Sequence, residues 1–396
     1  MDSRKFNNSR AGDIFEYEKD GERVSTFVPE PLPPEIRYDQ ETVKLIEDAA
    51  SNLNDLKGTG RNLPDPNIFI RPYILKEAVL SSQIEGTQTS FEEAVVRSES
   101  GDLEPSREAR DLEEVRNYVE ALNYGLERLN VEPLTVDLIK RIHEKLMSGV
   151  RGKDRSPGQF REKQVHIGEV GVSREDAEYV PMAPEKISSA MEDLVDFMNE
   201  DRGMPYLVKS ALIHYQFEAI HPFEDGNGRM GRLLIIIDMI RSGKLSQPLL
   251  YLSEYFNNNR GRYYDKLLRV SRDGEYEEWI DFFLRAVKTQ SSNSTSTAVK
   301  ILEKREKYKQ SLRQGEVPEN CVVLMENVFD LRPRTITQVA EELGVKYHAA
   351  RNYVNVLVEH GVLEQRDKKG REKQYVAGEL LRMMEEESSR VETNVI

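Results

Sequence analysis

Most of the chain carries apolar residues at helical spacing. Leu45, Ala49 and Leu53 recur four positions apart, which predicts an amphipathic helix after a polar start. A turn over 58–66 separates it from a second predicted helix over 70–86. Helical spacing continues downstream, and the later predicted helices cover 184–198, 206–220, 228–241, 261–270 and 277–305. The pattern therefore predicts a mainly α fold.

One segment interrupts this periodicity. Residues 164–168 and 177–182 are two short candidate strands, joined by a polar loop that contains glycines. The pattern predicts a β-hairpin inserted into a helical bundle.

Polar stretches divide the chain. Residues 1–28 are polar and predicted to be loose, and 29–106 form a helical region that begins with a proline-rich, extended segment. Residues 107–290 form the predicted core. A boundary is expected in 291–314, a linker or helix that includes SSNSTST.

The C-terminal part has a different pattern. Two predicted helices, 336–343 and 347–360, each end at a glycine, and a strand–turn–strand follows around Gly370. This order predicts a winged helix-turn-helix over 315–380, followed by a frayed acidic tail over 381–396. The predicted wing, RDKKGREK, carries five basic and two acidic residues, yet residues 317–378 balance nine of each. DNA binding and protein docking therefore both stay open.

Composition narrows the class of protein. A length of 396 residues suggests two or three domains, and the net charge of −14 argues against a chain coated for nucleic acid or anionic membrane. A single cysteine, Cys321, excludes an internal disulfide framework and fits a reducing cytoplasm. The longest apolar run, near 233–240, is interrupted by Asp238 and is too short to cross a bilayer. We expect a cytoplasmic protein without membrane contact.

The segment from His221 to Arg232 gathers residues that packing alone explains poorly. Pro222 ends the preceding helix, and two glycines allow a tight turn before the next helix starts. N–H groups at a helix start attract anions, and Arg229 and Arg232 add two guanidinium groups suited to a polyphosphate. Asp225 could hold Mg²⁺ between phosphates. His221 could accept a proton from a hydroxyl.

This segment, HPFEDGNGRMGR, resembles the signature of the Fic (filamentation induced by cyclic AMP) family at every defining position. The resemblance covers about 27–287. It implies a Fic-type helical bundle and transfer of AMP from ATP to a Ser, Thr or Tyr hydroxyl of a target protein. By this resemblance His221 is the general base, Phe223 is a buried anchor and Asp225 binds Mg²⁺. The implied ATP-binding residues are Gly226, Asn227, Gly228, Arg229, Met230, Gly231 and Arg232.

The resemblance also assigns the phosphates. Gly226, Asn227 and Gly228 would hold the α- and β-phosphates, with Arg229 at the β-phosphate and Arg232 at the γ-phosphate. Doc-like kinases of the same superfamily have lysine in place of the second motif glycine. Gly228 argues against that variant.

A second motif closes the predicted helix over 70–86. Ser81 and Glu85 lie four apart, hence on one face, and Gly86 is a suitable cap. A glutamate in a last helical turn opposes the helix dipole, at a cost of roughly 0.3–1 kcal/mol. An ordinary surface glutamate would fit this spacing. The motif also resembles the family's inhibitory motif (S/T)xxxE(G/N), which implies that Glu85 pairs with Arg232 and keeps ATP in an unproductive pose.

Two further sites are implied more weakly. The hairpin over 164–182 resembles the family's flap, where an extended target segment adds to a strand edge. A hairpin without such a role would fit equally. Asn258 and Tyr264, in YFNNNRGRYY, are candidates for contacts with adenine or are packing residues.

Two hypotheses follow. The first is an autoinhibited protein adenylyltransferase that uses ATP and Mg²⁺, with a homodimer implied because family members often dimerise. The second is a nucleotide-sensing, DNA-binding transcriptional regulator. The intact base His221 favours the enzyme, because a sensor needs no proton acceptor. A Fic enzyme that uses another nucleotide donor, or removes AMP, also stays open.

Overall fold

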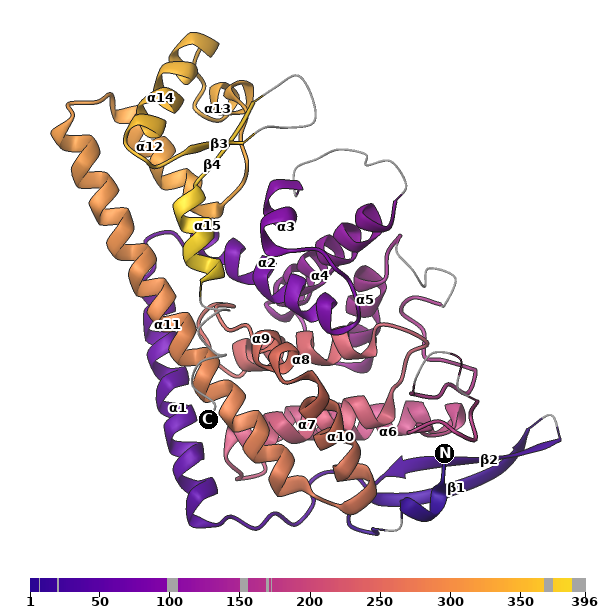
Figure 1. Cartoon of the computed structure of the whole chain (residues 1–396). Helices are drawn as coiled ribbons and strands as arrows, with labels where there is room; N and C mark the ends of the chain where they lie inside the picture. The colour runs from indigo at the N-terminus through magenta and orange to yellow at the C-terminus, as the bar shows by residue number, and fades with distance from the viewer. Residues whose placement is uncertain are drawn as a thin grey trace.

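The computed structural model describes residues 1–6, 8–19, 21–97, 106–149, 156–168, 171, 173–366 and 373–386. Within these residues the fold is mainly α, as predicted, with two small two-stranded sheets (Figure 1). None of the described helices combines the length and the apolar character that crossing a membrane would require.

A helical bundle makes up the centre of the molecule. Its middle consists of α7 (Tyr206–Ile220) and α8 (Asn227–Arg241), in which nearly every side chain is buried. Around this pair lie α2 (Pro66–Ile84), α3 (Phe91–Arg97), α4 (Arg107–Leu129), α5 (Val136–Leu146), α6 (Ile187–Asn199), α9 (Ser253–Asn258) and α10 (Arg260–Asp273). The loop between α7 and α8 is thus held by a rigid core.

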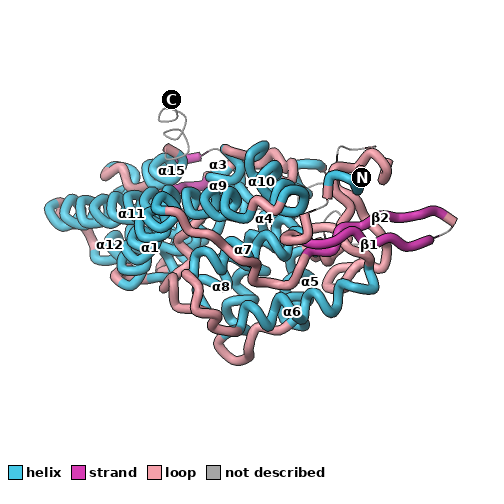
Figure 2. Tube along the Cα trace, turned by 90° about the horizontal axis from the view of Figure 1, so that it is seen from below, coloured by secondary structure: helices cyan, strands magenta, loops and turns pink. Residues whose placement is uncertain are grey.

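Two long helices, α1 (Gln40–Arg61) and α11 (Tyr276–Gln314), run side by side along one face (Figures 1 and 2). The stretch 291–314, expected to be a linker or a helix, is helical throughout and belongs to the 39 residues of α11. The linker alternative is wrong because Ser291, Ser294 and Thr297 are buried at helical spacing. Their polarity suggested a loop, but their small side chains face inward.

The first 28 residues, predicted to be loose, contain a β-hairpin. β1 (Gly12–Lys19) pairs antiparallel with β2 (Glu22–Pro29), and the hairpin extends away from the helices (Figure 2). The prediction failed because polar residues cover the outer face, while Val24 and Phe27 are almost fully buried. An ion pair of 2.6 Å between Arg10 and Glu277 also ties this segment to α11.

The two strands predicted in the 164–182 segment, called the flap below, are reduced to one bridge. It joins Ile167 and Tyr179 through two backbone hydrogen bonds of 2.8 and 3.2 Å. The ladder does not continue because Pro181 has no N–H group and the N–H of Phe27 takes the neighbouring carbonyl. Three residues of the flap loop lie outside the described residues.

After α11 the chain forms a smaller C-terminal unit. It contains α12 (Glu319–Asn327), the 3-10 turn η3 (Val328–Asp330), α13 (Ile336–Glu342), α14 (Tyr347–Glu359), β3 (Glu364–Arg366), β4 (Gln374–Val376) and α15 (Gly378–Glu385). Residues 367–372 of the predicted wing lie outside the described residues, as do residues 387–396.

The predicted boundary at 380 falls inside α15. The acidic tail expected from 381 begins as helix, because Leu380, Leu381 and Met384 are buried. This apolar face was hidden in the sequence by the glutamates that follow it.

We expect Phe27→Ala to lower the free energy of unfolding by about 3–5 kcal/mol, measured by urea denaturation. The Phe27 ring packs between Phe6 and Tyr179, with ring centroids 5.7 and 5.9 Å away. Glu18→Ala, on the exposed side of β1, should change the free energy of unfolding by less than about 0.5 kcal/mol. If Phe27→Ala had as small an effect as Glu18→Ala, the hairpin would not be part of the core.

Candidate active site

The loop after α7 begins with a constrained histidine. His221 lies in the left-handed region at φ 51° and ψ 62°. That conformation costs a residue other than glycine roughly 1–2 kcal/mol, so surrounding contacts must hold it. Arg161 supplies them: its Nε donates to the His221 carbonyl at 2.8 Å, and its backbone N–H donates to the Pro222 carbonyl at 3.0 Å.

Arg161 also links this loop to the flap. The side chain is almost fully buried, and its Nη2 donates to the Met182 carbonyl at 2.6 Å. Burial lowers the pKa of Arg161 to about 10. One buried guanidinium therefore fixes both the turn after α7 and the end of the flap.

Phe223 anchors the loop in the core. Its ring stacks on His143 of α5, with centroids 3.6 Å apart and planes at 4°. His143 Nδ1 accepts from the Gly158 N–H at 3.0 Å, so its Nε2 carries the proton donated to the Asp225 carbonyl at 2.9 Å. Burial lowers the pKa of His143 to about 4, which keeps this ring neutral.

Asn227 closes the turn from within. Its Oδ1 accepts from the Phe223 N–H and its Nδ2 donates to the Phe223 carbonyl, both at 2.9 Å. Gly226, at φ 75°, lets the chain reverse here. The side chain of Asn227 thus shapes the loop, which leaves main-chain N–H groups at the start of α8 for an anion.

Arg229 lies in the first turn of α8 and is buried. Its Nη1 donates to Glu114 of α4 at 3.0 Å, and its Nη2 lies 3.6 Å from Met147 Sδ. Its Nε is buried without a hydrogen-bond partner among the described residues. An unpartnered buried donor is costly, so this group would gain from an anion.

Arg232, one turn further along, is bound by the end of α2. Its Nε donates to Ser81 Oγ and its Nη2 to the Ser81 carbonyl, both at 2.9 Å. Nη2 also donates to Glu85 Oε1 at 2.7 Å. Burial opposes ionisation of Glu85, but the charge of Arg232 outweighs it and holds the pKa of Glu85 below its ordinary value.

The Glu85 carboxylate lies over the start of α8. A Cβ on Gly228 would come within 2.2 Å of Glu85 Oε1 and 2.9 Å of Arg232 Nη1, so a larger residue would displace these two side chains. Arg232 Nη1 is also buried without a partner in the described part of the chain. The carboxylate therefore occupies a place that helix dipole and guanidinium charge make favourable for an anion.

His221 is neutral at pH 7. Burial and the charge of Arg161 lower its pKa to about 4, against smaller opposing effects of the Glu218 carbonyl and the Glu85 carboxylate. An uncharged imidazole can accept a proton from a hydroxyl. His221 lies in the loop that leads to the start of α8, the place favourable for an anion, which is called the anion seat below.

Asp225 is the candidate metal ligand at the rim. Its Oδ1 accepts from the Gly226 N–H at 2.7 Å and lies 3.9 Å from Arg229 Nη2. Among the described residues, no three His, Cys, Asp or Glu side chains gather into a metal site. One carboxylate beside a phosphate seat nevertheless fits Mg²⁺, which commonly takes one or two carboxylates and completes its shell with phosphates and water.

The two residues predicted at adenine differ in position. Tyr264 is 42% exposed, and its ring lies beside the buried ring of Tyr263, with centroids 5.2 Å apart. Asn258 is exposed, and instead Asn257 donates to Gln83 Oε1 at 3.2 Å. In the described structure it is thus Asn257 that contacts the segment carrying Glu85.

The remaining predicted residues support the backbone. Met230 is fully buried, and its N–H donates to the Gly226 carbonyl at 2.9 Å. A Cβ on Gly231 would lie 2.3 Å from Glu218 Oε1. Gly86, at φ 102°, lets the chain turn away directly after Glu85.

Comparison with known proteins identifies the central bundle. Residues 43–127 match the model of the Fic/DOC family N-terminal region, and residues 133–237 match that of the Fic/DOC family. This part of the chain is a Fic domain. Its Fic model ends within α8 and includes the whole loop from His221 to Arg232.

Curated relatives are similar to this Fic-domain protein over part of their length. Protein adenylyltransferase fic-1 of Caenorhabditis briggsae is 28% identical over 221 residues, which cover 53% of this chain and 41% of the relative. Protein adenylyltransferase Fic of Nematostella vectensis is 26% identical over 258 residues, covering 64% and 56%. The chain thus spans about half the length of these relatives.

Solved structures share the fold. A crystal structure of a Fic family protein from Desulfovibrio desulfuricans G20 matches with a TM-score of 0.56 at 19% identity, covering 87% of this chain and 98% of that one. Fic-1 from C. elegans matches with a TM-score of 0.51 at 23% identity, covering 67% and 74%.

Sequence reasoning missed three residues that position the loop: Arg161, His143 and Glu114. Each lies outside the motif, on a segment joined to it only by folding. The one available signal was His143, a polar residue on the apolar face of the helix over 136–146.

We expect the His221 ring signals in an NMR titration to stay those of a neutral imidazole from pH 8 down to about pH 5. The reason is the lowered pKa of about 4, since the ring protonates only below that range. His221→Asn identifies the signals by their loss. A midpoint between pH 6 and 7 would contradict the burial described here.

Proposed function

We propose that this Fic-domain protein is a protein adenylyltransferase that transfers AMP from ATP to a Ser, Thr or Tyr hydroxyl of a target protein, inhibited by its own Glu85. The anion seat at the start of α8 carries the proposal. It combines unpartnered N–H groups of Arg229 and Arg232, the place over Gly228 that the Glu85 carboxylate occupies, and the neutral imidazole of His221. Relatives named protein adenylyltransferase support the same chemistry.

In the proposed reaction, His221 takes the proton of the target hydroxyl, and the hydroxyl oxygen attacks the α-phosphorus of ATP. A new O–P bond joins AMP to the target, the bond from the α-phosphorus to the α,β-bridging oxygen breaks, and pyrophosphate leaves. Arg229 and Arg232 would hold the β- and γ-phosphates, which aligns the leaving group opposite the attacking oxygen. Asp225 would hold Mg²⁺, which supplies further positive charge at the phosphates.

Inhibition follows from competition for Arg232. Glu85 and a γ-phosphate would both require its Nη groups, and the Glu85 carboxylate already lies over Gly228. ATP that binds beside Glu85 would have to place its terminal phosphate elsewhere. The α-phosphorus would then be out of line for attack.

The flap is the proposed place where the target binds. Ile167 is 37% exposed, and its segment offers a backbone edge to an extended peptide. Arg161 ties the other end of the flap to the turn that carries His221. A homodimer is proposed from the family resemblance alone.

The test uses ATP labelled at the α- or γ-phosphate, with cell extract as the source of target. Glu85→Gly should fix α-label on protein at least about 5-fold faster than the wild type, because Arg232 is freed for phosphate. Glu85→Gln is a matched control that keeps the shape and removes the charge, and it should release part of the inhibition. His221→Asn in the Glu85→Gly background should abolish labelling.

Other outcomes point to other activities. Label from the γ-phosphate would indicate a kinase. Loss of AMP from previously modified protein would indicate the reverse reaction, and label only from a different nucleotide would indicate another donor. Equal α-labelling in wild type and Glu85→Gly would contradict inhibition by Glu85.

A second candidate function is DNA binding by the C-terminal unit, in which we infer a winged helix-turn-helix from α13, α14, β3 and β4. Residues 343–358 contain no acidic residue, in a chain of net charge −14. Lys346, His348, Arg351 and Asn352 are exposed on α14 and before it. Arg and Asn are side chains that read guanine and adenine in the major groove.

We expect binding of random duplex DNA at low salt, measured by fluorescence anisotropy. Lys346→Gln and Arg351→Gln should each weaken it and lower the slope of log K against log salt by about 1. Lys300→Gln, on the exposed surface of α11, serves as the control. Absence of binding even at low salt, where contacts with phosphates are strongest, would favour protein docking instead.

A further inference from the structure

The inhibitory helix α2 is shared between two parts of the molecule. At its C-terminal end, Ser81 and the residue after the helix, Glu85, bind Arg232. Its first turns contact the C-terminal unit. The Phe69 ring packs on Phe329 of η3, with centroids 5.2 Å apart, and both side chains are buried. One helix therefore contacts both the candidate active site and the C-terminal unit.

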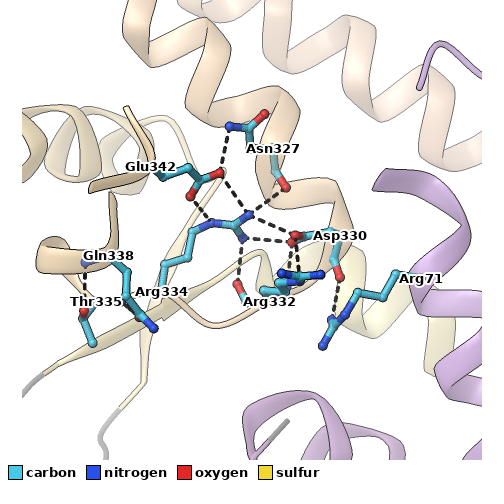
Figure 3. Close-up of polar contacts among 8 residues, drawn as sticks. All are labelled: Arg71, Asn327, Asp330, Arg332, Arg334, Thr335, Gln338 and Glu342. Carbon is cyan, nitrogen blue, oxygen red and sulfur yellow. Dashed lines mark hydrogen bonds and ion pairs between the residues drawn. The ribbon is translucent and has the colours of Figure 1, made fainter. Parts of the chain in front are cut away.

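Arg71 makes a polar contact in the same place. Its Nη1 donates to the Asp330 carbonyl at 2.9 Å (Figure 3). The Asp330 side chain is fixed in turn by the buried Arg334, with bonds of 2.9 and 3.0 Å, and Arg334 Nε donates to Glu342 of α13 at 2.8 Å. Figure 3 shows this cluster as one connected network. Arg71 thus holds a rigid part of the C-terminal unit rather than a loose loop.

Lys76 makes the deepest contact. Its side chain is only 2% exposed, its Nζ lies 3.2 Å from Glu254 Oε1, and it donates to the Met384 carbonyl at 2.7 Å. Met384 lies in the last turn of α15, where carbonyl groups lack partners inside the helix and carry partial negative charge. If α15 moved away from α2, the ammonium group of Lys76 would lose the Met384 carbonyl as an acceptor. The docked position of α15 is therefore favoured.

We propose that the docking of the C-terminal unit on α2 holds Glu85 against Arg232 and so sets the strength of inhibition. Lys76 lies eight residues, about 12 Å, before Ile84, the last residue of α2, and Glu85 follows directly. Glu77 also fixes α2, since its Oε2 accepts from the Ser253 N–H at 3.1 Å, so undocking shifts the inhibitory equilibrium without removing it. A partner that binds the C-terminal unit and weakens this docking would activate the site. The inference rests on the proposed function.

The experiment compares Arg71→Gln and Phe329→Ala in the full chain, each with Glu85 present and in the Glu85→Gly background. Arg382→Gln is the matched control, because Arg382 pairs with Glu364 inside the C-terminal unit at 2.6 Å. AMP transfer is measured with α-labelled ATP. Hydrogen exchange of amides 77–86 is a second readout that needs no activity.

With Glu85 present, both docking variants should raise AMP transfer about 5-fold or more and speed exchange at 77–86, whereas Arg382→Gln should do neither. In the Glu85→Gly background the rates should change less than about 2-fold, because the coupling has no inhibitor to act on. Unfolding of the C-terminal unit by Phe329→Ala would also remove docking, so the same result is expected.

Different results would overturn the coupling and the proposed function. An active Glu85→Gly variant together with unchanged rates and exchange in both docking variants would overturn the coupling alone. If hydrogen exchange at 77–86 became faster in the docking variants but no variant transferred AMP, docking would stabilise α2 without regulating a reaction. That result would overturn the proposed function.

Discussion

Arg232 is a buried cation, and the arrangement of the site depends on what pairs with it. Removing a guanidinium from water is costly unless an anion and further acceptors compensate. Ser81 supplies two acceptors and Glu85 the charge, with contacts of 2.9, 2.9 and 2.7 Å. In the proposed mechanism a phosphate replaces Glu85 as the partner of Arg232. The inhibited state and the nucleotide-bound state would then be alternative ways to neutralise one side chain.

The loop around that cation is rigid for reasons unrelated to nucleotide. Arg161 holds the left-handed His221 through its carbonyl, His143 supports Phe223 and the Asp225 carbonyl, and Asn227 bridges the turn. None of these contacts uses the Arg229 or Arg232 side chain, so they do not depend on which anion is bound. A base and an anion seat held in this way need little rearrangement during a reaction.

The sequence predicted those parts of the site that lie close together along the chain. His221 to Arg232 form one loop, and Ser81 and Glu85 share a helix face, so local spacing was informative. Arg161 and Lys76 gave no such signal, because an arginine or lysine reads as a surface residue until folding buries it. The helical core was predicted from periodicity.

The N-terminal hairpin was predicted wrongly, and the stretch 291–314 was left open between a linker and a helix, for a related reason. Polar residues allowed a loop at both, whereas at Ser294 small size decides the packing and at Phe27 a single aromatic ring does. Local polarity reports which side chains prefer water, but not which of them a neighbouring helix or strand will cover.

The 39 residues of α11 also constrain how the protein can change over evolution. The helix is about 58 Å long, and each residue advances it by 1.5 Å and turns it by roughly 100°. Loss or gain of one residue between its two ends would swing the C-terminal unit around the axis and away from α2. Loops commonly tolerate insertions. In α11, only an insertion or deletion close to a whole number of helical turns would keep the C-terminal unit facing α2. The length of α11 therefore fixes where the C-terminal unit lies and how it is rotated relative to the Fic domain. Exchange of such units between relatives would have to preserve both the length and the rotation.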